Sequence, residues 1–377
     1  MRDVYITRTS KFLPNNPVNN DEMEKLLGEV NGKESRARRI VLRNNKIETR
    51  YYAIDKEGKP THSNAQIAKE AVEGLLDEHF TKDDIELLSF GTGSADQTLP
   101  SHAAMVHGEL KGSNMEINSP TGACCSGMNA LKYGYLSIKA GEVENAVCGA
   151  SERVSGWLRG GIYEDEVTHL STLEEKPILA FNKDFLRWML SDGAGAFLLQ
   201  PEPTGDVNLK IEWMDGYSFA NELESCMFSG SDKNEDGTLT SWNEIPVEDW
   251  TKKSVFALKQ DTRLLGENVL VKGVESMVRS MNKHNVTVND IDYFLPHISS
   301  HFFKERLYSE MEERGVAVPW DKWFINLSEV GNIGAVSIYL MIDGLIATGK
   351  LKKGDKIWLI VPESARFSYF NALLTVY

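Results

Sequence analysis

Two adjacent cysteines, Cys124 and Cys125, begin a segment in which a turn is followed by the pattern of a helix. Apolar side chains then recur at helical spacing, at Met128, Leu131, Tyr135 and Ile138. A thiol in the first turn of a helix faces unpaired backbone N–H groups and the positive end of the helix dipole, and this environment favours the thiolate. The segment therefore predicts a nucleophilic cysteine.

The bulk composition is that of an ordinary folded protein. Of the 377 residues, 41% are hydrophobic and 25% are charged, which suits two modest domains or one large α/β domain. The formal net charge is −14, so we expect no nucleic acid among the partners.

The cysteine count and the apolar pattern indicate a compartment. No apolar run approaches the length of a membrane span, and residues 1–10 lack the apolar stretch of a signal peptide. Four cysteines, two of them adjacent, do not make a disulfide framework. We therefore expect a cytoplasmic protein whose functional cysteine acts as a thiol.

Segments with helical and strand patterns alternate along the chain. Helical periodicity covers residues 64–79 and 264–285, and each of these helices precedes a short apolar strand, at 85–91 and 291–295. Helices that alternate with buried strands indicate a layered α/β fold.

The two halves of the chain share an internal repeat. Three short matches occur in the same order, at offsets of 206, 208 and 211: residues 81–88 with 287–294, 140–143 with 348–351, and Glu152 with Glu363. Because the order is kept and the offset drifts little, the matches predict a duplicated α/β unit, with one half at 1–205 and the other at 206–377.

The repeat distinguishes between the two cysteines. Gly141 lies 17 residues after Cys124, and Gly349 lies 17 residues after Asn332, so Cys124 and Asn332 occupy equivalent positions at the starts of two helices. His297 follows a strand of the second half. If the halves pack about a pseudo-twofold axis, these three side chains meet at one site.

Each of these residues also has a purely structural explanation. Cys124 could be a small core residue, His297 a loop histidine and Asn332 a helix cap. Cys125 is the rival nucleophile, with packing into the base of the helix as its structural alternative.

At these residues the sequence resembles the thiolase superfamily, and within it the β-ketoacyl-acyl carrier protein synthase III group. The residues that carry the resemblance are Cys124 with Gly141, Pro296-His297, Gly331-Asn332 and the stretch Asp192-Gly-Ala-Gly-Ala. It covers nearly the whole chain. It implies a thiolase fold, with two pseudo-symmetric α/β halves in a layered αβαβα arrangement.

The resemblance also implies a reaction. An acyl thioester loads Cys124, backbone N–H groups of Cys124 and of the loop Ser364, Ala365 and Arg366 hold the oxyanion, and His297 with Asn332 binds the carbonyl of a β-ketoacyl or malonyl thioester. A Claisen condensation follows, and neither a metal nor another cofactor is required. A narrower resemblance, to ketosynthases that form dialkylresorcinol or pyrone lipids in secondary metabolism, implies a cyclisation afterwards.

Substrate-binding residues follow from the same resemblance. Arg39, Arg43 and Arg50 lie in a locally basic stretch that resembles the segment meeting the arm of CoA or of an acyl carrier protein. A solvated helix and loop explain that charge equally well. Leu99 lies in a segment that resembles the one crossing the interface of a homodimer, and Trp157 is a further candidate for contact with the substrate.

Several related activities can be separated by residue. A degradative thiolase needs a second cysteine in its C-terminal half, and no cysteine follows Cys226. A hydroxymethylglutaryl-CoA synthase has a catalytic glutamate where this chain has Gly93. An O-acyltransferase that uses the same acyl-cysteine remains the alternative. The loop 364–366 departs from the family, which has glycines there. A non-catalytic subunit is disfavoured because the full Cys, His and Asn set is present.

Overall fold

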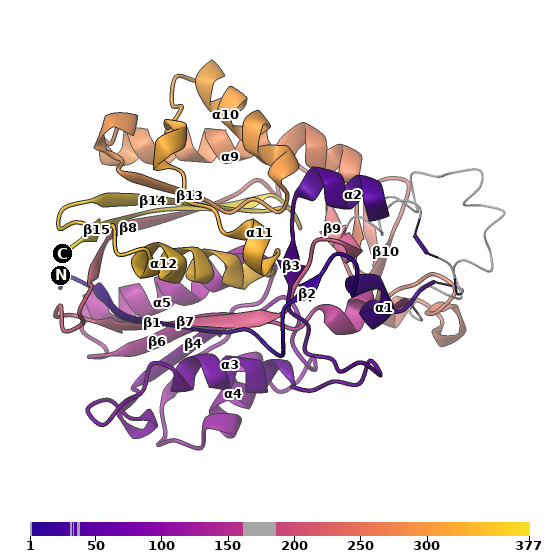
Figure 1. The fold of residues 1–377 in the computed structure, drawn as a ribbon, viewed down its shortest axis with the longest axis horizontal. Coiled ribbons are helices and arrows are strands. Elements are labelled where there is room, and N and C mark those ends of the chain that lie inside the picture. Colours follow the sequence, from indigo (N-terminus) through magenta and orange to yellow (C-terminus); the bar gives the residue numbers. More distant parts are fainter. Residues whose placement is uncertain (1, 31, 33, 36–37, 161–185) are drawn as a thin grey trace.

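The structure is a computed structural model that describes residues 2–30, 32, 34–35, 38–160 and 186–377. Its helices and strands alternate in five layers (Figure 1). The layered α/β fold predicted from the sequence is thus confirmed. Within the described ranges, no helix is long and apolar enough to cross a membrane.

In the described part of the chain, one sheet of nine strands folds over into two facing layers, in the order β13–β14–β15–β8–β1–β7–β6–β4–β5. One layer contains β1 (Tyr5–Phe12), β4 (Leu87–Gly91), β5 (Glu116–Asn118), β6 (Ala146–Glu152) and β7 (Gly193–Gln200). The other contains β8 (Leu209–Ser218), β13 (Tyr293–Pro296), β14 (Lys356–Glu363) and β15 (Ser368–Val376). The layers join where β1 and β8 pair over two residues each.

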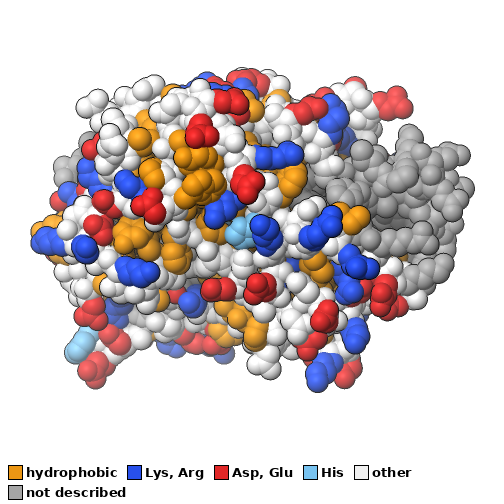
Figure 2. Space-filling model, turned by 45° about the horizontal axis from the view of Figure 1, so that its top comes forward, with side chains coloured by type: hydrophobic (Ala, Val, Ile, Leu, Met, Phe, Trp, Pro, Cys, Tyr) orange, Lys and Arg blue, Asp and Glu red, His pale blue; other side chains and the backbone are white. Residues whose placement is uncertain are grey.

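Helices cover both outer faces and fill the space between the strand layers. The outer helices are α3 (Asn64–Glu73) and α4 (His102–Leu110) on one side and α9 (Thr262–His284) and α10 (Lys304–Glu313) on the other. The central pair is α5 (Cys125–Ala140) and α12 (Ser337–Ala347). Over the face that Figure 2 shows, acidic and basic side chains are interspersed.

Short elements gather beyond one end of the layers, at the right of Figure 1. They include α1 (Met23–Leu27), α2 (Arg38–Asn45), β2 (Val18–Asn19), β3 (Thr49–Arg50), β9 (Met227–Phe228) and β10 (Ser231–Lys233). The remaining short elements are β11 (Leu239–Ser241), β12 (Lys259–Gln260) and α11 (Leu327–Val330).

The 3₁₀ helices of the described residues are spread along the chain. They are η1 (Lys82–Asp84), η2 (Ser155–Leu158), η4 (Trp242–Glu244), η5 (Val247–Asp249), η6 (Val288–Asp290), η7 (His301–Phe303), η8 (Trp320–Lys322) and η9 (Gly334–Val336).

The first matched pair of segments has the same local structure in both halves. Thr81 and Thr287 each form a capping box with an aspartate three residues later, and each box begins a 3₁₀ turn. Each turn leads into a strand, β4 or β13, which pairs in parallel with β6 or β14. The division at residues 205 and 206 itself stays a prediction.

The segment after Asn332 differs from its predicted form. The pattern predicts a helix over 333–347, whereas the structure has a 3₁₀ turn, η9, before α12 begins at Ser337. Asn332 therefore precedes a 3₁₀ turn, and Cys124 is the N-cap residue of an α-helix. Gly141 ends that helix at a φ of 83°, a left-handed conformation that favours glycine.

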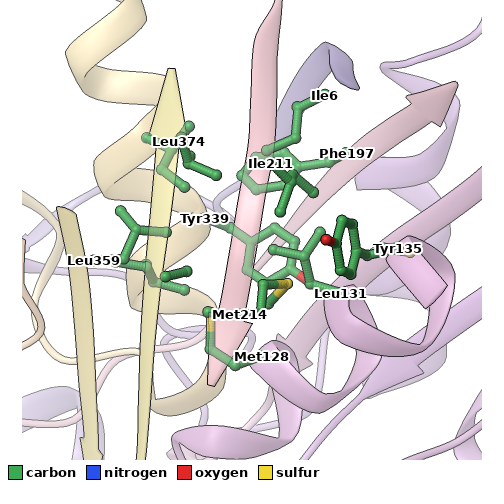
Figure 3. Packing of buried hydrophobic residues seen from close by; sticks show 14 of the residues in the cluster. Ile6, Met128, Leu131, Tyr135, Phe197, Ile211, Met214, Tyr339, Leu359 and Leu374 are labelled. Atoms are coloured by element: carbon green, nitrogen blue, oxygen red, sulfur yellow. The ribbon is translucent and has the colours of Figure 1, made fainter. Parts of the chain in front are cut away.

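The central helices form the core together with the inner faces of both strand layers. Figure 3 shows Met128 and Leu131 of α5 and Tyr339 of α12 packed among strand residues such as Met214 and Leu359. Most of the side chains of α12 are buried, and this burial on all sides follows from its apolar sequence. The core thus holds both helices between the layers.

The two central helices contact each other near their N-terminal ends. The Tyr339 hydroxyl donates a hydrogen bond to the Gly127 carbonyl at 2.9 Å. A Cβ atom added at Gly127 would lie 2.4 Å from the carbonyl oxygen of Ala335. Only glycine fits this contact, which fixes the segments before both helices next to each other.

We expect Gly127→Ala to lower the free energy of unfolding by at least about 2 kcal/mol, because the added methyl group must displace the backbone at Ala335. Equilibrium unfolding in urea measures the change. The matched control is Gly108→Ala on exposed α4, where an added Cβ has no neighbour within 4 Å. Alanine there should stabilise the helix by about 0.5–1 kcal/mol. Equal destabilisation by both substitutions would contradict this account of the contact.

Candidate active site

A cavity of about 260 Å³ contains the residues that precede both central helices. Cys124, His297 and Asn332 line it, together with Glu152. The structure therefore brings together the three residues that the sequence singled out, although they are far apart in the chain.

The walls of the cavity are mainly apolar. They are formed by the segment after β6, the residues before β7, strand β9, the residue before β12, the first half of α9, the residues after β13 and η7. The apolar residues are Val154, Leu186, Met189, Leu190, Met227, Phe228, Leu258, Leu265, Val269, Leu270, Ile298 and Phe303. A site with apolar walls and a few convergent polar groups suits a substrate with an alkyl chain and one polar end.

The two cysteines have different surroundings. Cys124 is half-buried and lines the cavity. Cys125 is 2% exposed, packs in the core and directs its Sγ toward the carbonyl oxygen of Val361 at 3.4 Å. The geometry therefore places Cys124, and not Cys125, where a substrate can reach it.

The protonation state of Cys124 differs from the sequence-based expectation. Burial raises the pKa of the Cys124 thiol, and the nearby carboxylates of Glu363 and Glu152 raise it further. Glu363 accepts hydrogen bonds from the backbone N–H groups of Ala123 at 3.0 Å and Cys125 at 2.9 Å. A carboxylate thus occupies the helix N-terminus that was expected to favour the thiolate, and the resting thiol is protonated.

His297 follows β13 and is held by its backbone. Its N–H donates to the carbonyl of Ile360 at 2.9 Å, and the residue is 3% exposed. Burial lowers the pKa of the His297 imidazole to about 4. The ring is therefore neutral near pH 7 and has one N–H to donate into the cavity.

Asn332 is fixed on both sides. Its backbone N–H donates to the carbonyl of Met189 at 3.0 Å, and its carbonyl accepts from the N–H of Ser191 at 2.9 Å. The side-chain Oδ1 accepts from the N–H of Gly334 at 3.0 Å. This bond orients the amide group and leaves Nδ2 as its donor.

Glu152 is a site residue to which the sequence assigns no role. It ends β6, is 3% exposed and lines the cavity. Burial raises the pKa of its carboxyl group to about 7, although hydrogen bonds to the carboxylate oppose this rise. The feature of the sequence that points to this residue is the internal repeat, in which Glu152 aligns with Glu363 at an offset of 211.

The loop expected to complete the oxyanion site reaches the cavity in part. It connects β14 to β15, and Ser364 and Ala365 line the cavity. The Ala365 carbonyl accepts hydrogen bonds from the N–H groups of Cys226 and Met227, which fix the loop. Arg366 is not brought to the cavity: its side chain is exposed and donates to the carbonyl of Leu223 at 3.3 Å.

The three arginines that we expect to bind the arm of CoA or of a carrier protein differ in their exposure to solvent. Arg39 and Arg43 are exposed on α2. Arg50 is fully buried and donates to the Trp188 carbonyl at 2.8 Å and to Asn20 Oδ1 at 2.6 Å. The prediction for Arg50 is therefore wrong as a surface contact, because its guanidinium group ties buried segments together.

The two remaining candidates have distinct positions. Trp157 is half-buried in η2 and lines the cavity, as expected of a residue that contacts substrate. Leu99 is 84% exposed beside Pro100. An apolar side chain this exposed is compatible with an interface between two copies, which stays a prediction.

Comparison of the sequence with known families gives one match in each half of the chain. Residues 281–363 match the C-terminal domain of 3-oxoacyl-[acyl-carrier-protein] synthase III, and residues 63–204 match the N-terminal domain of β-ketoacyl synthase. The β-ketoacyl-[acyl-carrier-protein] synthase III of Clostridium novyi is 26% identical over 369 residues, which cover 96% of this chain and 95% of that protein.

Solved structures share the fold along the whole chain. OleA of Xanthomonas campestris, with bound lauric acid and lauroyl-CoA, superposes with a TM-score of 0.74 at 18% identity and covers 99% of each chain. The 3-oxoacyl-[acyl-carrier-protein] synthase III of Aquifex aeolicus superposes with a TM-score of 0.68 at 21% identity, again over 99% of each chain.

The matches to both halves, the coverage of relatives over their whole length and the shared fold agree with one another. The chain belongs to the thiolase superfamily, and within it the chain is similar to the ketosynthases of the β-ketoacyl synthase III group.

Proposed function

We propose that this chain transfers an acyl group from a thioester to Cys124 and then joins it to a second thioester through a carbon–carbon bond. The observation that carries the proposal is the presence of Cys124, His297 and Asn332 on one cavity with apolar walls. The bound lauric acid and lauroyl-CoA in the OleA structure support an acyl thioester as the donor.

In the first step the sulfur of Cys124 attacks the thioester carbonyl, and its proton leaves with the departing thiol. The N–H groups of Ala123 and Cys125 already bind Glu363. Stabilisation of the oxyanion therefore falls to the N–H of Cys124 and to those of Ser364 and Ala365.

In the second step His297 and Asn332 hold the carbonyl oxygen of the second thioester. A neutral imidazole and a primary amide both donate hydrogen bonds, so they stabilise negative charge on that oxygen as an enolate forms. The enolate carbon attacks the acyl group, and the sulfur of Cys124 leaves. The low pKa of His297 suits a donor and not a base.

The wider substrate and partner assignments belong to the same proposal. The acyl chain packs against the apolar walls and Trp157, and exposed Arg39 and Arg43 meet the phosphate of CoA or of a carrier protein. The proposal includes a homodimer contact at Leu99 and a cytoplasmic location. It also includes cyclisation of the product to a resorcinol, cyclohexanedione or pyrone precursor in secondary metabolism. The reaction uses no metal and no redox cofactor.

We expect the wild-type protein and Cys125→Ala to gain the mass of one acyl group when incubated with dodecanoyl-CoA. Cys124→Ala should gain none, because Cys125 is in the core and cannot reach the thioester. Intact-protein mass spectrometry measures the adduct. An adduct that persists in Cys124→Ala but disappears in Cys125→Ala would reverse the assignment.

We expect His297→Ala to form the acyl-enzyme but to condense it at least about 100-fold more slowly, because one donor to the enolate oxygen is lost. The measurement is the amount of condensation product formed when the acyl-enzyme is mixed with β-ketoacyl-CoA or with malonyl-CoA. Ester products alone, formed from an added alcohol by the wild type, would favour the O-acyltransferase and contradict the condensing activity.

A further inference from the structure

Glu152 presents a carboxylate to the cavity from a well-defined position. Its Oε1 accepts from the N–H of Gly93 at 3.0 Å, and its Oε2 accepts from the Ser94 hydroxyl at 2.5 Å. The Thr92 hydroxyl is 3.4 Å from Oε2. The loop after β4 thus fixes the carboxylate on the same cavity as Cys124.

Two glycines leave space around this carboxylate. A Cβ atom added at Gly93 would lie 3.4 Å from Glu152 Oε1, and one at Gly334 would lie 3.3 Å from it. Both glycines line the cavity, and the N–H of Gly334 holds the Asn332 side chain. The carboxylate therefore lies beside the turn that positions one of the enolate-binding residues.

A buried carboxylate can instead be purely structural, tying the loop after β4 to β6. Such a group is normally paired with a cation when it is charged. In the described part of the chain, the groups that interact with the Glu152 carboxylate are uncharged hydrogen-bond donors, among them the backbone N–H of Ala335, and the carboxylate lies on a cavity lined by Cys124. Its carboxyl pKa of about 7 lets it exchange a proton near neutral pH, as a general base must.

We propose that Glu152 is the general base that removes the α-proton from a β-ketoacyl thioester, and that the second substrate is therefore a β-ketoacyl and not a malonyl thioester. This inference rests on the proposed condensing function. A malonyl thioester forms its carbanion by losing carbon dioxide and needs no base. A β-ketoacyl thioester has no such group to lose, so its proton must pass to the protein.

The atoms balance without another reactant. The Glu152 carboxylate takes the α-proton and becomes a carboxylic acid, while the enolate forms against His297 and Asn332. The enolate carbon bonds to the acyl carbon, and the carbon–sulfur bond to Cys124 breaks. The leaving thiolate takes the proton from Glu152, which restores the resting thiol and the carboxylate.

The base must be ionised before it can act, so its pKa sets the pH dependence. The Cys124 thiol interacts electrostatically with both Glu152 and Glu363, and the neutral His297 lines the same cavity as Cys124 and Glu152. In the acyl-enzyme the thiol cannot ionise. Condensation should rise with pH through about 7 as Glu152 loses its proton.

The test is a single turnover of dodecanoyl-loaded enzyme mixed with a β-ketoacyl-CoA or with malonyl-CoA. Glu152→Gln keeps the shape and the acceptor oxygen but cannot take a proton. It should still load Cys124, which also shows that it is folded, and condense the β-ketoacyl substrate at least about 100-fold more slowly than it loads and than the wild type condenses. The increase in rate near pH 7 should disappear.

Two further variants separate a base from a structural or purely electrostatic role. Ser94→Ala removes a hydrogen bond that lowers the pKa of Glu152, so the midpoint of the pH profile should move upward. Glu363→Gln removes the other carboxylate near Cys124 and should retain the midpoint near pH 7. A structural Glu152 would leave the midpoint unchanged in Ser94→Ala.

Wild-type rate and pH profile in Glu152→Gln would overturn the assignment of the base. Efficient condensation by the wild type with malonyl-CoA, and none with the β-ketoacyl-CoA, would overturn the assignment of the substrate. Loading of Cys124 without a carbon–carbon product from either substrate would instead contradict the condensing function itself.

Discussion

The close contact between the two central helices determines the geometry of the site. Gly127 in α5 meets the Ala335 carbonyl and the Tyr339 hydroxyl, at a place where no larger residue fits. Because the contact is near the N-terminal end of both helices, Cys124, just before α5, and Asn332, shortly before the turn η9 that leads into α12, lie on one cavity. The packing of glycine against backbone thus brings both halves of the chain to a single site.

Desolvation sets the charge state of this site. A helix N-terminus contributes only about 0.3–1 kcal/mol toward an anion, which is less than one pKa unit, so desolvation and a nearby carboxylate readily outweigh it. At Cys124 burial prevails, and Glu363 takes the N–H groups that would have stabilised a thiolate. The resting cavity therefore contains a neutral thiol and a neutral imidazole, which lowers the cost of admitting an apolar acyl chain.

The sequence predicted the fold class and the convergence of Cys124, His297 and Asn332, because periodicity and an internal repeat report topology. It did not predict which charged side chains are buried. Arg50 and Arg43 belong to one basic stretch, yet only Arg50 turns inward and bonds to Trp188. The raised pKa of the Cys124 thiol has the same origin, since burial depends on contacts between distant segments. Such contacts leave no periodic pattern.

Glu152 and Glu363 are aligned by the internal repeat, although the repeat by itself indicates no function for either residue. Glu152 and Glu363 end equivalent strands, β6 and β14, and both carboxyl pKa values are raised by burial. Their partners differ, however. Glu363 accepts from two backbone N–H groups at the start of α5, whereas Glu152 accepts from the loop after β4 and lines the cavity. One carboxylate thus holds the start of α5, and the other lies on the cavity, where the proposed general base must lie.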